Sequence, residues 1–543
     1  MSYAFKTEFG RNVFYQKYAQ GINDTWPLLA QRMVDDVCGT RNGTTHALMS
    51  VNDRAELVQA ITAMKFVPAG RYLYYAGRDV SFFNNCLVYV SKDDTREAWA
   101  DFLYQATSAL MSGAGIGNCY SVFRPEGLPL GRSGGLSSGP LPLMACANEI
   151  GRNVMQGGSR RSALYASLHW DHGDIHKFIT CKEYDDATKA RKEADFNSPA
   201  PMDMTNISVN WDDAGLKAAS VKGSEGHTTW MMTLEGMLRS AEPGFSFNLG
   251  ENQDEVGRNA CAEVTSPDDC DICNLGSMNI ANITSIQELD DLTQLAAKFL
   301  ICGSIRAHVP TEKVRLVREL NRTTGLGVMG VHEWLLQRGE KYRMSSTLQQ
   351  WMQVLKTATK KGADEQCDRF YLSRPRKYNA IAPAGSIGIL AGTTTGVEPL
   401  FAPAYKRRYL RDGTTWVYQN VVDPTAARII QDYGITNPDT MDCAYNIGYE
   451  QRIEFQADMQ DHIDMAISST CNLPAWGTEG NNEEGVEAFS DILLKYAPRL
   501  RGFTAYADGC RGGQPLTVMP YSEAIKDTST VHVENEGTCL SGT

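Results

Sequence analysis

Alternation of strand-like runs with helical stretches is the feature that most constrains the fold of this 543-residue chain. Strand-like runs are expected over 206–211, 385–391 and 502–506. Helices are expected over 97–111, 148–155, 174–180, 312–320, 331–337, 348–370 and 484–496. Strands that alternate with helices favour an α/β fold with parallel pairing. The length suits roughly three or four domain-sized units, or one large α/β barrel with additions.

The two ends of the chain differ from this middle part. Residues 1–80 are expected to be mostly helical, because Leu57, Val58, Ile61 and Met64 recur at helical spacing. The apolar and aromatic run 82–90 then indicates a strand. We therefore expect a helical region over 1–80, an α/β region over 81–520 and a flexible polar tail over 521–543.

Charge and composition restrict the partners and the compartment. The net charge is −12, and the basic surplus that grips a nucleic-acid backbone is not evident, so no nucleic-acid partner is expected. The sequence has neither a signal-peptide-like start nor an apolar stretch of about 18 residues, so we expect a cytoplasmic protein that does not enter a membrane. In that reducing compartment the 14 cysteines are expected to be thiols, not a disulfide framework.

Three polar residues alternate in one short segment. Asn259, Cys261 and Glu263 stand at i, i+2 and i+4. In an extended segment such side chains share one face, so an amide, a thiol and a carboxylate would converge on one small ligand. The amide would orient the ligand, the carboxylate would transfer a proton, and the thiol would attack or carry a radical. The spacing alone equally suits a strand with accidental polar alternation.

A Cys-x-x-Cys pair, Cys270 and Cys273, follows this segment. In many zinc sites such a pair supplies two of the four ligands, but this sequence contains no second Cys-x-x-Cys pair. It is also the spacing of a thioredoxin-like redox pair. Under that interpretation Cys273 is a redox thiol, and no metal is expected.

Several segments in order resemble the ribonucleotide reductase family, over roughly residues 65 to 520. The active-site finger loop of that family is similar to residues 259–277, NACAEVTSPDDCDICNLGS. The strand with its other redox cysteine is similar to residues 83–94, FNNCLVYVSKDD. Its Gly-Arg-Arg block and His-x-Asp-Ile helix resemble QGGSRRSALYASLHWDHGDIHKFI, and its late phosphate loop resembles APAGSIGILAGTTTGVEPLFAPAYKRR. The late strand of the adenosylcobalamin-dependent (class II) members is similar to RGFTAYADGCRGGQPLT.

The resemblance implies a ten-stranded α/β barrel with a central finger loop, and reduction of ribonucleotides to 2′-deoxyribonucleotides. It makes Cys261 the thiyl-radical carrier that abstracts and returns the 3′-hydrogen. Glu263 would take the 3′-OH proton, and Asn259 would hydrogen-bond the ribose hydroxyls. Cys86 and Cys273 would supply two electrons as thiols and finish as a disulfide. Cys273 is favoured over Cys270 because the Asn-Leu-Gly-Ser that follows it matches the family.

The resemblance places the substrate phosphates on two backbone segments. The late segment consists of Ala384, Gly385, Ser386 and Ile387. The early segment consists of Pro68, Ala69 and Gly70. Main-chain N–H groups of the late segment would cradle a diphosphate at a helix N-terminus, and an ordinary glycine turn is the alternative. Diphosphate and triphosphate substrates both stay open.

The family also has a specificity site for a deoxynucleoside triphosphate (dNTP) effector. Asp93, seven residues after Cys86, falls where the resemblance places a ligand of the effector ribose, with a solvated loop acid as the alternative. Arg124 begins the expected loop one at 124–135, and loop two is expected near 181–206.

Adenosylcobalamin is the radical source that the resemblance favours. The oxygen-dependent class passes its radical through paired tyrosines near the C-terminus, whereas Tyr506 stands alone in that strand and Tyr74-Tyr75 is far upstream. The glycyl-radical class usually lacks the active-site Glu and needs its own glycine motif. Homolysis of a Co–C bond next to Cys261 needs neither feature.

The sequence departs from the family pattern in two places. One concerns control of overall activity, and the other concerns re-reduction of the active-site thiols. Cys86 comes early, so we expect no N-terminal ATP-cone domain. The tail has one cysteine, Cys539, where the family usually has a pair, and Cys510 lies in a late turn. Cys539, Cys510 or a thioredoxin-, glutaredoxin- or dithiol-type reductant acting directly would then restore the thiols. The compact length resembles small phage-encoded members, for which the compartment is the host cytoplasm. It leaves no obvious insertion of the kind by which monomeric members of the family imitate a dimer, so we expect a homodimer.

Three rival interpretations remain. Gly325 to Gly330 matches the G-x-G-x-x-G pattern of nicotinamide-dependent oxidoreductases, but the residues before it, 312–321, are helical and charged. A non-catalytic nucleotide-binding relative is expected to lose some of the catalytic cysteines, which this chain keeps. A reductase that depends on a separate metal-containing radical subunit is the third.

Overall fold

The computed structural model describes residues 5–40, 46–84, 86–131, 134–154, 162–194, 198–411, 415–510, 516–528 and 531–533. The chain begins with three helices and a short strand-helix unit. These are α1 (Glu8–Lys17), α2 (Trp26–Cys38), α3 (Val51–Thr62), β1 (Phe66–Pro68) and α4 (Gly70–Tyr75). The side chains of Thr7, Thr25 and Ser50 cap the first three helices by accepting a main-chain N–H.

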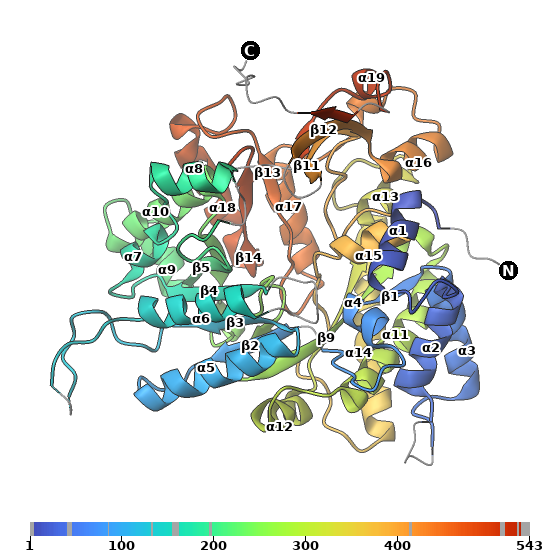
Figure 1. The fold of residues 1–543 in the computed structure, drawn as a ribbon, viewed down its shortest axis with the longest axis horizontal. Helices are drawn as coiled ribbons and strands as arrows, with labels where there is room; N and C mark the ends of the chain where they lie inside the picture. The colour runs from blue at the N-terminus through green and yellow to red at the C-terminus, as the bar shows by residue number, and fades with distance from the viewer. Residues whose placement is uncertain are drawn as a thin grey trace.

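Five parallel strands form the first half of the barrel. They are β2 (Cys86–Val90), β3 (Gly115–Cys119), β4 (Leu164–His169), β5 (Thr205–Trp211) and β6 (Gly244–Phe247), hydrogen-bonded in chain order. The connecting helices are α5 (Arg96–Met111), α6 (Leu141–Asn153), α7 (Ile175–Thr180), α8 (Asp186–Ala194), α9 (Asp213–Ala219) and α10 (Glu225–Ser240). These helices gather on one side of the molecule, at the left of Figure 1. Helical connections are what parallel neighbours require.

The second half returns along the other side. β9 (Asp271–Asn279) pairs antiparallel with β2 and parallel with β10 (Thr324–Met329). The extended run 377–382 follows, because Thr324 N donates to Lys377 O (3.0 Å) and Ile381 bridges Ile467. β13 (Cys471–Leu473) then pairs with β15 (Ala505–Ala507), and β14 (Gly502–Phe503) pairs with β6. The ring therefore closes, and the predicted α/β barrel is confirmed.

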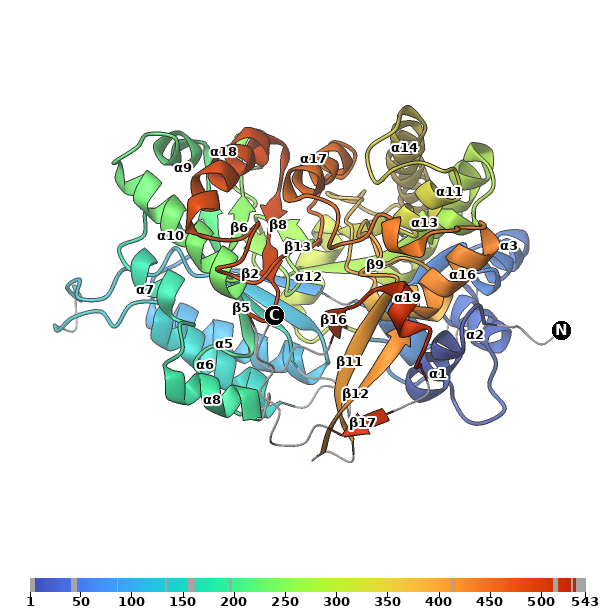
Figure 2. The same ribbon diagram turned by 90° about the horizontal axis from the view of Figure 1, so that it is seen from above.

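The remaining elements cover this half. They are α11 (Ile286–Arg306), α12 (Glu312–Asn321), α13 (Val331–Leu336), α14 (Ser346–Arg369), α15 (Gly385–Ala391), α16 (Pro424–Asp432), α17 (Tyr449–Gln460), α18 (Val486–Tyr496) and α19 (Tyr521–Ala524). A separate sheet joins β16 (Leu516–Val518), β11 (Ala404–Arg411), β12 (Thr415–Val422) and β17 (Val531–Val533), in that order. Figure 2 shows the long β11–β12 hairpin projecting beside the barrel.

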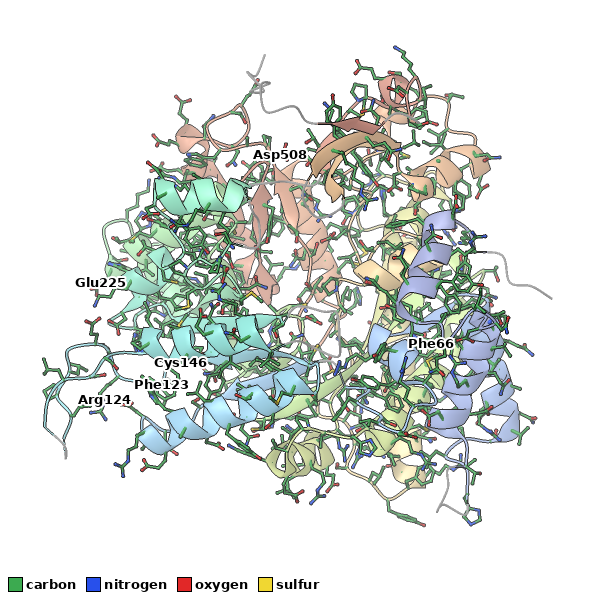
Figure 3. The ribbon with its side chains drawn as sticks, viewed as in Figure 1. Phe66, Phe123, Arg124, Cys146, Glu225 and Asp508 are labelled. Atoms are coloured by element: carbon green, nitrogen blue, oxygen red, sulfur yellow. The ribbon has the colours of Figure 1, made fainter. Side chains whose placement is uncertain are left out.

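Two large hydrophobic cores stabilise the two sides. The N-terminal helices share one core with α11, α13 and α14, and β1 joins the large sheet with Phe66 opposite Met278. The other core lies between the first five barrel strands and their helices. Figure 3 shows Phe66 on the first side, and Arg124 and Cys146 on the second. The helices of residues 1–80 thus pack against the second half of the barrel.

A hairpin enters the barrel between the two halves. Its stem consists of β7 (Gly257–Arg258) and β8 (Thr265–Ser266), and its tip spans 259–264. β3 makes room for it with glycine, because a Cβ at Gly117 would lie 2.0 Å from the carbonyl oxygen of Arg258. From the opposite wall, Ala466 N donates to the carbonyl of Glu263 (2.9 Å). This hairpin is the finger loop.

Three expected elements differ in the structure. Residues 385–391, expected to be a strand, form α15, because Ile387, Leu390 and Ala391 bury one helical face and a short apolar run does not reveal its period. α6 begins seven residues before the expected start at 148, at Leu141. The expected strand 502–506 is split at Thr504, because β14 and β15 pair with different neighbours.

None of the helices in the described part of the chain is both long enough and apolar enough to cross a lipid bilayer.

Candidate active site

The tip of the finger loop is a tight turn, not the extended segment that the polar alternation suggested. Ala262 N donates to Asn259 O (3.0 Å), and Ala262 adopts a left-handed conformation with φ of 64°. The turn leaves Cys261 exposed and buries Asn259 and Glu263. The three groups therefore converge through a chain reversal, and not through strand geometry.

Buried polar atoms beside the tip have no partner within the described part of the chain. Asn259 Oδ1 accepts a hydrogen bond from Val264 N (2.9 Å), whereas its Nδ2 has no hydrogen-bond partner there. Oε2 of Glu263 is likewise buried without one. Burying such atoms unpaired costs about 1 to 3 kcal/mol each. The amide donor and the carboxylate acceptor lie close to each other, and each keeps one atom without a hydrogen bond to a described residue, which suits a ligand with hydroxyl groups.

Cys86 and Cys273 lie directly opposite each other. They are register partners in the antiparallel pairing of β2 and β9. Directly opposite residues have Cβ atoms about 4.5 to 5.5 Å apart, so small side-chain adjustments bring two such sulfurs into bonding range. Cys86 Sγ also lies 3.8 Å from Oε1 of Glu263. The tip carboxylate therefore sits above a cross-strand thiol pair.

Burial sets the protonation of these groups. It raises the pKa of Glu263 to about 7, although contacts with its own backbone, Asn259 and Cys86 act in the opposite direction. Burial, together with the neighbouring Glu263 charge, raises the pKa of the Cys86 thiol well above its usual range. Burial and then Asp271 and Glu263 do the same for Cys273. At neutral pH the pair is therefore made of thiols beside a half-ionised carboxylate.

The structure separates the two members of the Cys-x-x-Cys pair. Cys273 packs with Cys86, Val88 and Ala380 in a small apolar cluster, whereas Cys270 packs into the core of the first half-barrel. Among the described residues, no group of three or more His, Cys, Asp and Glu side chains is arranged to hold a metal ion. Cys273 is the one that faces the finger loop.

The two expected phosphate-binding segments lie at the ends of barrel strands. Ala69 shares the small apolar cluster with both buried cysteines, and its N–H donates to Leu275 O (3.1 Å). Ala384, with φ of 54°, precedes α15, and Gly385 at the helix start faces open space. The run 377–382, whose Ala380 belongs to the same cluster, leads directly into that helix.

Comparison with known proteins identifies the family. The family model described as "Ribonucleotide reductase, barrel domain" matches residues 84–210, 224–367 and 373–506. The chain belongs to the ribonucleotide reductase family. The residues that the sequence predicted to be catalytic all lie within the matched ranges; they are Cys86, Asn259, Cys261, Glu263 and Cys273.

Curated relatives of this reductase include two kinds of named enzyme. A "Vitamin B12-dependent ribonucleoside-diphosphate reductase" of Mycobacterium tuberculosis is 27% identical, with 84% of this chain and 72% of the relative covered. A "Putative adenosylcobalamin-dependent ribonucleoside-triphosphate reductase" of Mycobacterium phage D29 is 26% identical, with 80% and 71% covered.

Solved structures of two classes share the fold. A B12-dependent (class II) reductase matches with a TM-score of 0.71 at 15% identity, covering 97% of this chain and 94% of that chain. The Actinobacillus ureae class Id alpha subunit matches with a TM-score of 0.72 at 15% identity, covering 94% and 99%. The fold is thus common to both classes.

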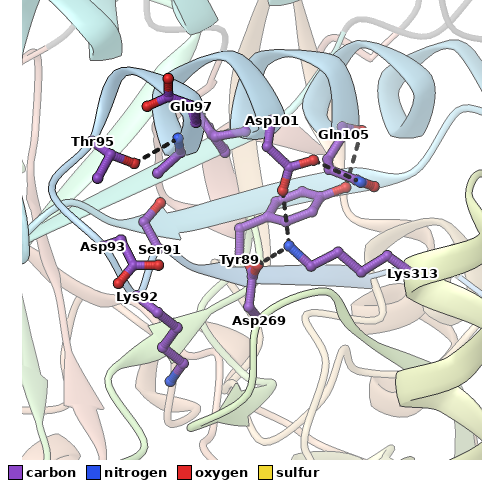
Figure 4. A pocket seen from close by; sticks show the side chains of 12 residues that line it. Tyr89, Ser91, Lys92, Asp93, Thr95, Glu97, Asp101, Gln105, Asp269 and Lys313 are labelled. Atoms are coloured by element: carbon purple, nitrogen blue, oxygen red, sulfur yellow. Dashed lines mark hydrogen bonds and ion pairs between the residues drawn. The ribbon is translucent and has the colours of Figure 1, made fainter.

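The two expected effector residues of the reductase have different surroundings: Asp93 lines a cavity, whereas Arg124 does not line it. Asp93 lines a cavity of about 410 Å³ at the end of β2 (Figure 4). Arg124 instead pairs with Asp94 and donates to Pro129 O (3.0 Å). Asp174 fixes the start of loop one, because its carboxylate accepts the N–H of Glu126 (2.8 Å).

Sequence reasoning missed the residues that hold the finger loop. Arg258 is fully buried in the stem, where it donates to Asn248 Oδ1 (2.7 Å) and to main-chain carbonyls. Glu255 accepts from Thr265 (2.6 Å) and pairs with Lys377 and Arg501, both at 2.7 Å. Arg258 directly precedes the Asn-x-Cys-x-Glu segment, and this position could have singled it out in the sequence. Glu255 had no such signal, because its charged partners Lys377 and Arg501 are far away in the sequence.

The G-x-G-x-x-G pattern belongs to strand packing. Gly325 and Gly327 lie within β10. A Cβ at Gly325 would lie 3.2 Å from Cys273 Sγ, and one at Gly327 would lie 2.3 Å from Ala380 O. Gly325 and Gly327 are inside the strand, and only Gly330 lies in the turn between β10 and α13. The first two glycines therefore serve close strand packing, and the three do not form a dinucleotide-binding loop.

Other expected redox and loop residues are placed only in part. Cys510 is half-buried in the turn after β15. Tyr506, half-buried in β15, lies opposite Asn472. Cys539, the glycines and arginines of the 155–161 block, and parts of both expected effector loops (132–133 and 195–197) lie outside the described residues.

Proposed function

We propose that this reductase converts ribonucleotides to 2′-deoxyribonucleotides by thiyl-radical chemistry at Cys261. The observation that carries the proposal is the exposed thiol at the finger tip, above a buried cross-strand Cys86–Cys273 pair and a buried Glu263. One cysteine is thus accessible to an external radical source, and two are placed to become a disulfide. Few other reactions require both arrangements in one site.

The residues divide the chemistry between them. The Cys261 thiyl takes the hydrogen atom from C3′ of the ribose, while Glu263 accepts the 3′-OH proton. One thiol of the Cys86–Cys273 pair gives a proton to the 2′-OH, which leaves as water while Asn259 holds the hydroxyl edge. The pair then delivers the two electrons and the second proton and forms a disulfide, Glu263 returns the 3′-OH proton, and Cys261 returns its hydrogen atom to C3′. The balance is one ribonucleotide and two thiols to one deoxyribonucleotide, one disulfide and water.

Adenosylcobalamin is the proposed source of the Cys261 radical. The named relatives above support it, and the exposed position of Cys261 fits a large cofactor that docks over the finger tip. When bound, the cofactor supplies the radical that oxidises the thiol. The chain itself keeps the reacting ribose and the two reducing thiols in a buried setting.

Substrate phosphates are assigned to the two backbone segments at 68–70 and 384–387. Their support is the position of Ala69 beside the cysteines and the open space at Gly385. The relatives include both a diphosphate and a triphosphate reductase, so the charge of the substrate is part of the test.

We also propose a dNTP effector at Asp93 and Arg124, a homodimer, and a thioredoxin-, glutaredoxin- or dithiol-type reductant in the cytoplasm. The cavity that Asp93 lines supports the effector site. Cys539 or Cys510 is the proposed relay to the reductant.

The test is turnover of the purified protein with adenosylcobalamin, dithiothreitol and a ribonucleoside di- or triphosphate. We expect deoxyribonucleotide without any second protein. The second candidate is a catalytic subunit that needs a separate metal-containing radical subunit, and the fold shared with a class Id alpha subunit is compatible with it. Product that appears only when such a subunit is added would replace the cobalamin assignment with this one.

A further inference from the structure

The cavity beside Asp93 contains an ion network that the sequence motifs do not mention. Its lining residues come from the end of β2, the start of α5, the segment before β9, and α12 (Figure 4). The charged lining residues are Lys92, Asp93, Glu97, Asp101, Asp269 and Lys313. The four carboxylates outnumber the two lysines. Both lysines already have protein partners, so an anionic ligand that binds a lysine here must displace one of these partners.

Lys313 of α12 is the centre of the network. Its Nζ lies 2.8 Å from Asp101 Oδ2 and 2.6 Å from Asp269 Oδ2. Partial burial disfavours the charge, but the two carboxylates outweigh it and raise the pKa of Lys313 above its usual value. Thr311, the N-cap of α12, also donates to Gln105 of α5 (2.6 Å). One ammonium group thus joins α5, α12 and the segment before β9.

Asp269 belongs to the connection between the finger loop and the Cys273 strand. That connection, residues 267–270, joins β8 to β9. The other carboxylate oxygen of Asp269 accepts the N–H of Val90 (3.0 Å), and Lys92 Nζ donates to Pro267 O (2.6 Å). The connection is therefore held from the cavity side, with Glu263 four residues before it and Cys273 three residues after it.

A second set of hydrogen bonds anchors the connection outside the cavity lining, and one of its donors, Asn321, lies at the other end of α12 from Lys313. Asn321 Nδ2 donates to Asp268 (2.8 Å) and to Asp271 (3.1 Å). Ser266 Oγ also donates to Asp271 (2.7 Å). Releasing Asp269 would loosen one side of the connection without unfolding it.

We propose that an anionic nucleotide in this cavity takes Lys313 away from Asp269, and that the loosened 267–270 connection carries the signal to the finger loop and to Cys273. Lys313 is then a positioning residue. Phosphate oxygens are strong charge-assisted acceptors, and a half-exposed ion pair is weak enough to be exchanged. The inference rests on the proposed function, because it assigns the regulation of the proposed effector site.

The test is amide hydrogen exchange in the peptide covering 264–272, with dATP as the probe. In the wild-type protein we expect saturating dATP to speed this exchange about three- to fivefold, the scale of one weak ion pair. Lys313→Met should exchange fast without dATP and show no further response, while still binding it. Lys313→Arg should behave as the wild type.

Lys298→Met is the matched control, because Lys298 also joins two elements through one half-buried ion pair, with Glu365 (2.9 Å), but lies outside the cavity. If Lys313→Met does not fold, Asp269→Asn removes the same pair and carries the same expectation. Three results would each overturn the proposal. They are slower or unchanged exchange in the wild type with dATP, a failure of dATP to bind, and a wild-type response in Lys313→Met. Turnover with adenosylcobalamin is measured separately, so an active enzyme without this response refutes the coupling alone.

Discussion

The two ends of β2 carry opposite chemistry. At its first residue, Cys86 faces Cys273 in a buried, largely apolar cluster beneath the finger loop. At its last residue, Val90 N donates to Asp269 beside an open, charged cavity. Only a few residues separate a buried thiol pair from a cavity lined with charged side chains.

This difference shows how one barrel would keep the proposed radical chemistry apart from the proposed effector site. Low polarity keeps thiols protonated and leaves reactive groups without competing water. A cavity of paired charges instead binds and releases ligands readily, because each ion pair is individually weak. The β2–β9 pairing joins the two ends, and under the proposal above it lies beside the connection that carries the signal.

The largest expected effect is at the buried end. Cys261→Ser should lower turnover at least about a thousandfold, because an alcohol does not replace a thiyl radical, while nucleotide binding persists. The measurement is deoxyribonucleotide formation by chromatography. Cys146→Ser, at an exposed cysteine on α6, is the control and should keep wild-type turnover. Turnover that survives Cys261→Ser would remove the radical role from this residue.

Glu263→Gln should lower kcat about a hundredfold, the contribution of a positioned proton acceptor. Because burial raises the pKa of Glu263 to about 7, the wild-type rate should rise with pH through 7 as the carboxylate ionises. The variant should lose this step in its pH profile. A wild-type profile that is flat between pH 6 and 8 would contradict the role of Glu263 as the base.

The same raised pKa has a consequence for stability. The folded state keeps the Glu263 proton up to about pH 7, whereas the unfolded state loses it near 4.5. The free energy of unfolding should therefore fall as pH rises from about 4.5 to 7, by up to about 3 kcal/mol. Urea unfolding of the wild type and Glu263→Gln across this range isolates the contribution.

Gly117→Ala tests whether the finger loop needs the glycine in β3. A Cβ would lie 2.0 Å from the carbonyl oxygen of Arg258, so we expect a loss of about 2 kcal/mol, or about thirtyfold in the folding equilibrium. Urea unfolding is the measurement. Gly131→Ala is the control, because a Cβ there meets nothing within 4 Å. Equal stabilities for the two variants would show that the loop does not fit closely against β3.

Asp93→Ala should have the smallest effect and should act at the charged end alone. We expect about tenfold weaker dNTP binding, from the loss of one charge-assisted hydrogen bond, with little change in turnover without effector. Calorimetric titration with dATP measures it, and Asp53→Asn on α3 serves as the control. A fall in effector-free turnover as large as that of Glu263→Gln would mean that the two ends are not separate sites.

Local patterns anticipated much of the fold. The helices 97–111, 312–320 and 348–370 appear within two residues of their expected bounds, because caps and helical spacing are local properties. Residues 385–391 did not follow the expectation, because a short apolar run suits a strand or a helix and its neighbours decide. The turn at the finger tip was also not anticipated, since a left-handed Ala262 has no sequence signal.

The sequence by itself determined which groups this reductase has for its chemistry: an Asn-x-Cys-x-Glu segment, two further cysteines, and the order of the family motifs. Residue types and short spacings are written in the chain, so they can be read without a fold. The family resemblance favoured Cys273 over Cys270 as the partner of Cys86, but only the tertiary structure placed Cys273 opposite Cys86 and Cys270 in the other core. It alone showed that Lys313 holds the 267–270 connection between β8 and β9. Those relations join residues up to 187 positions apart, and they depend on strand register and on burial, which the barrel as a whole sets.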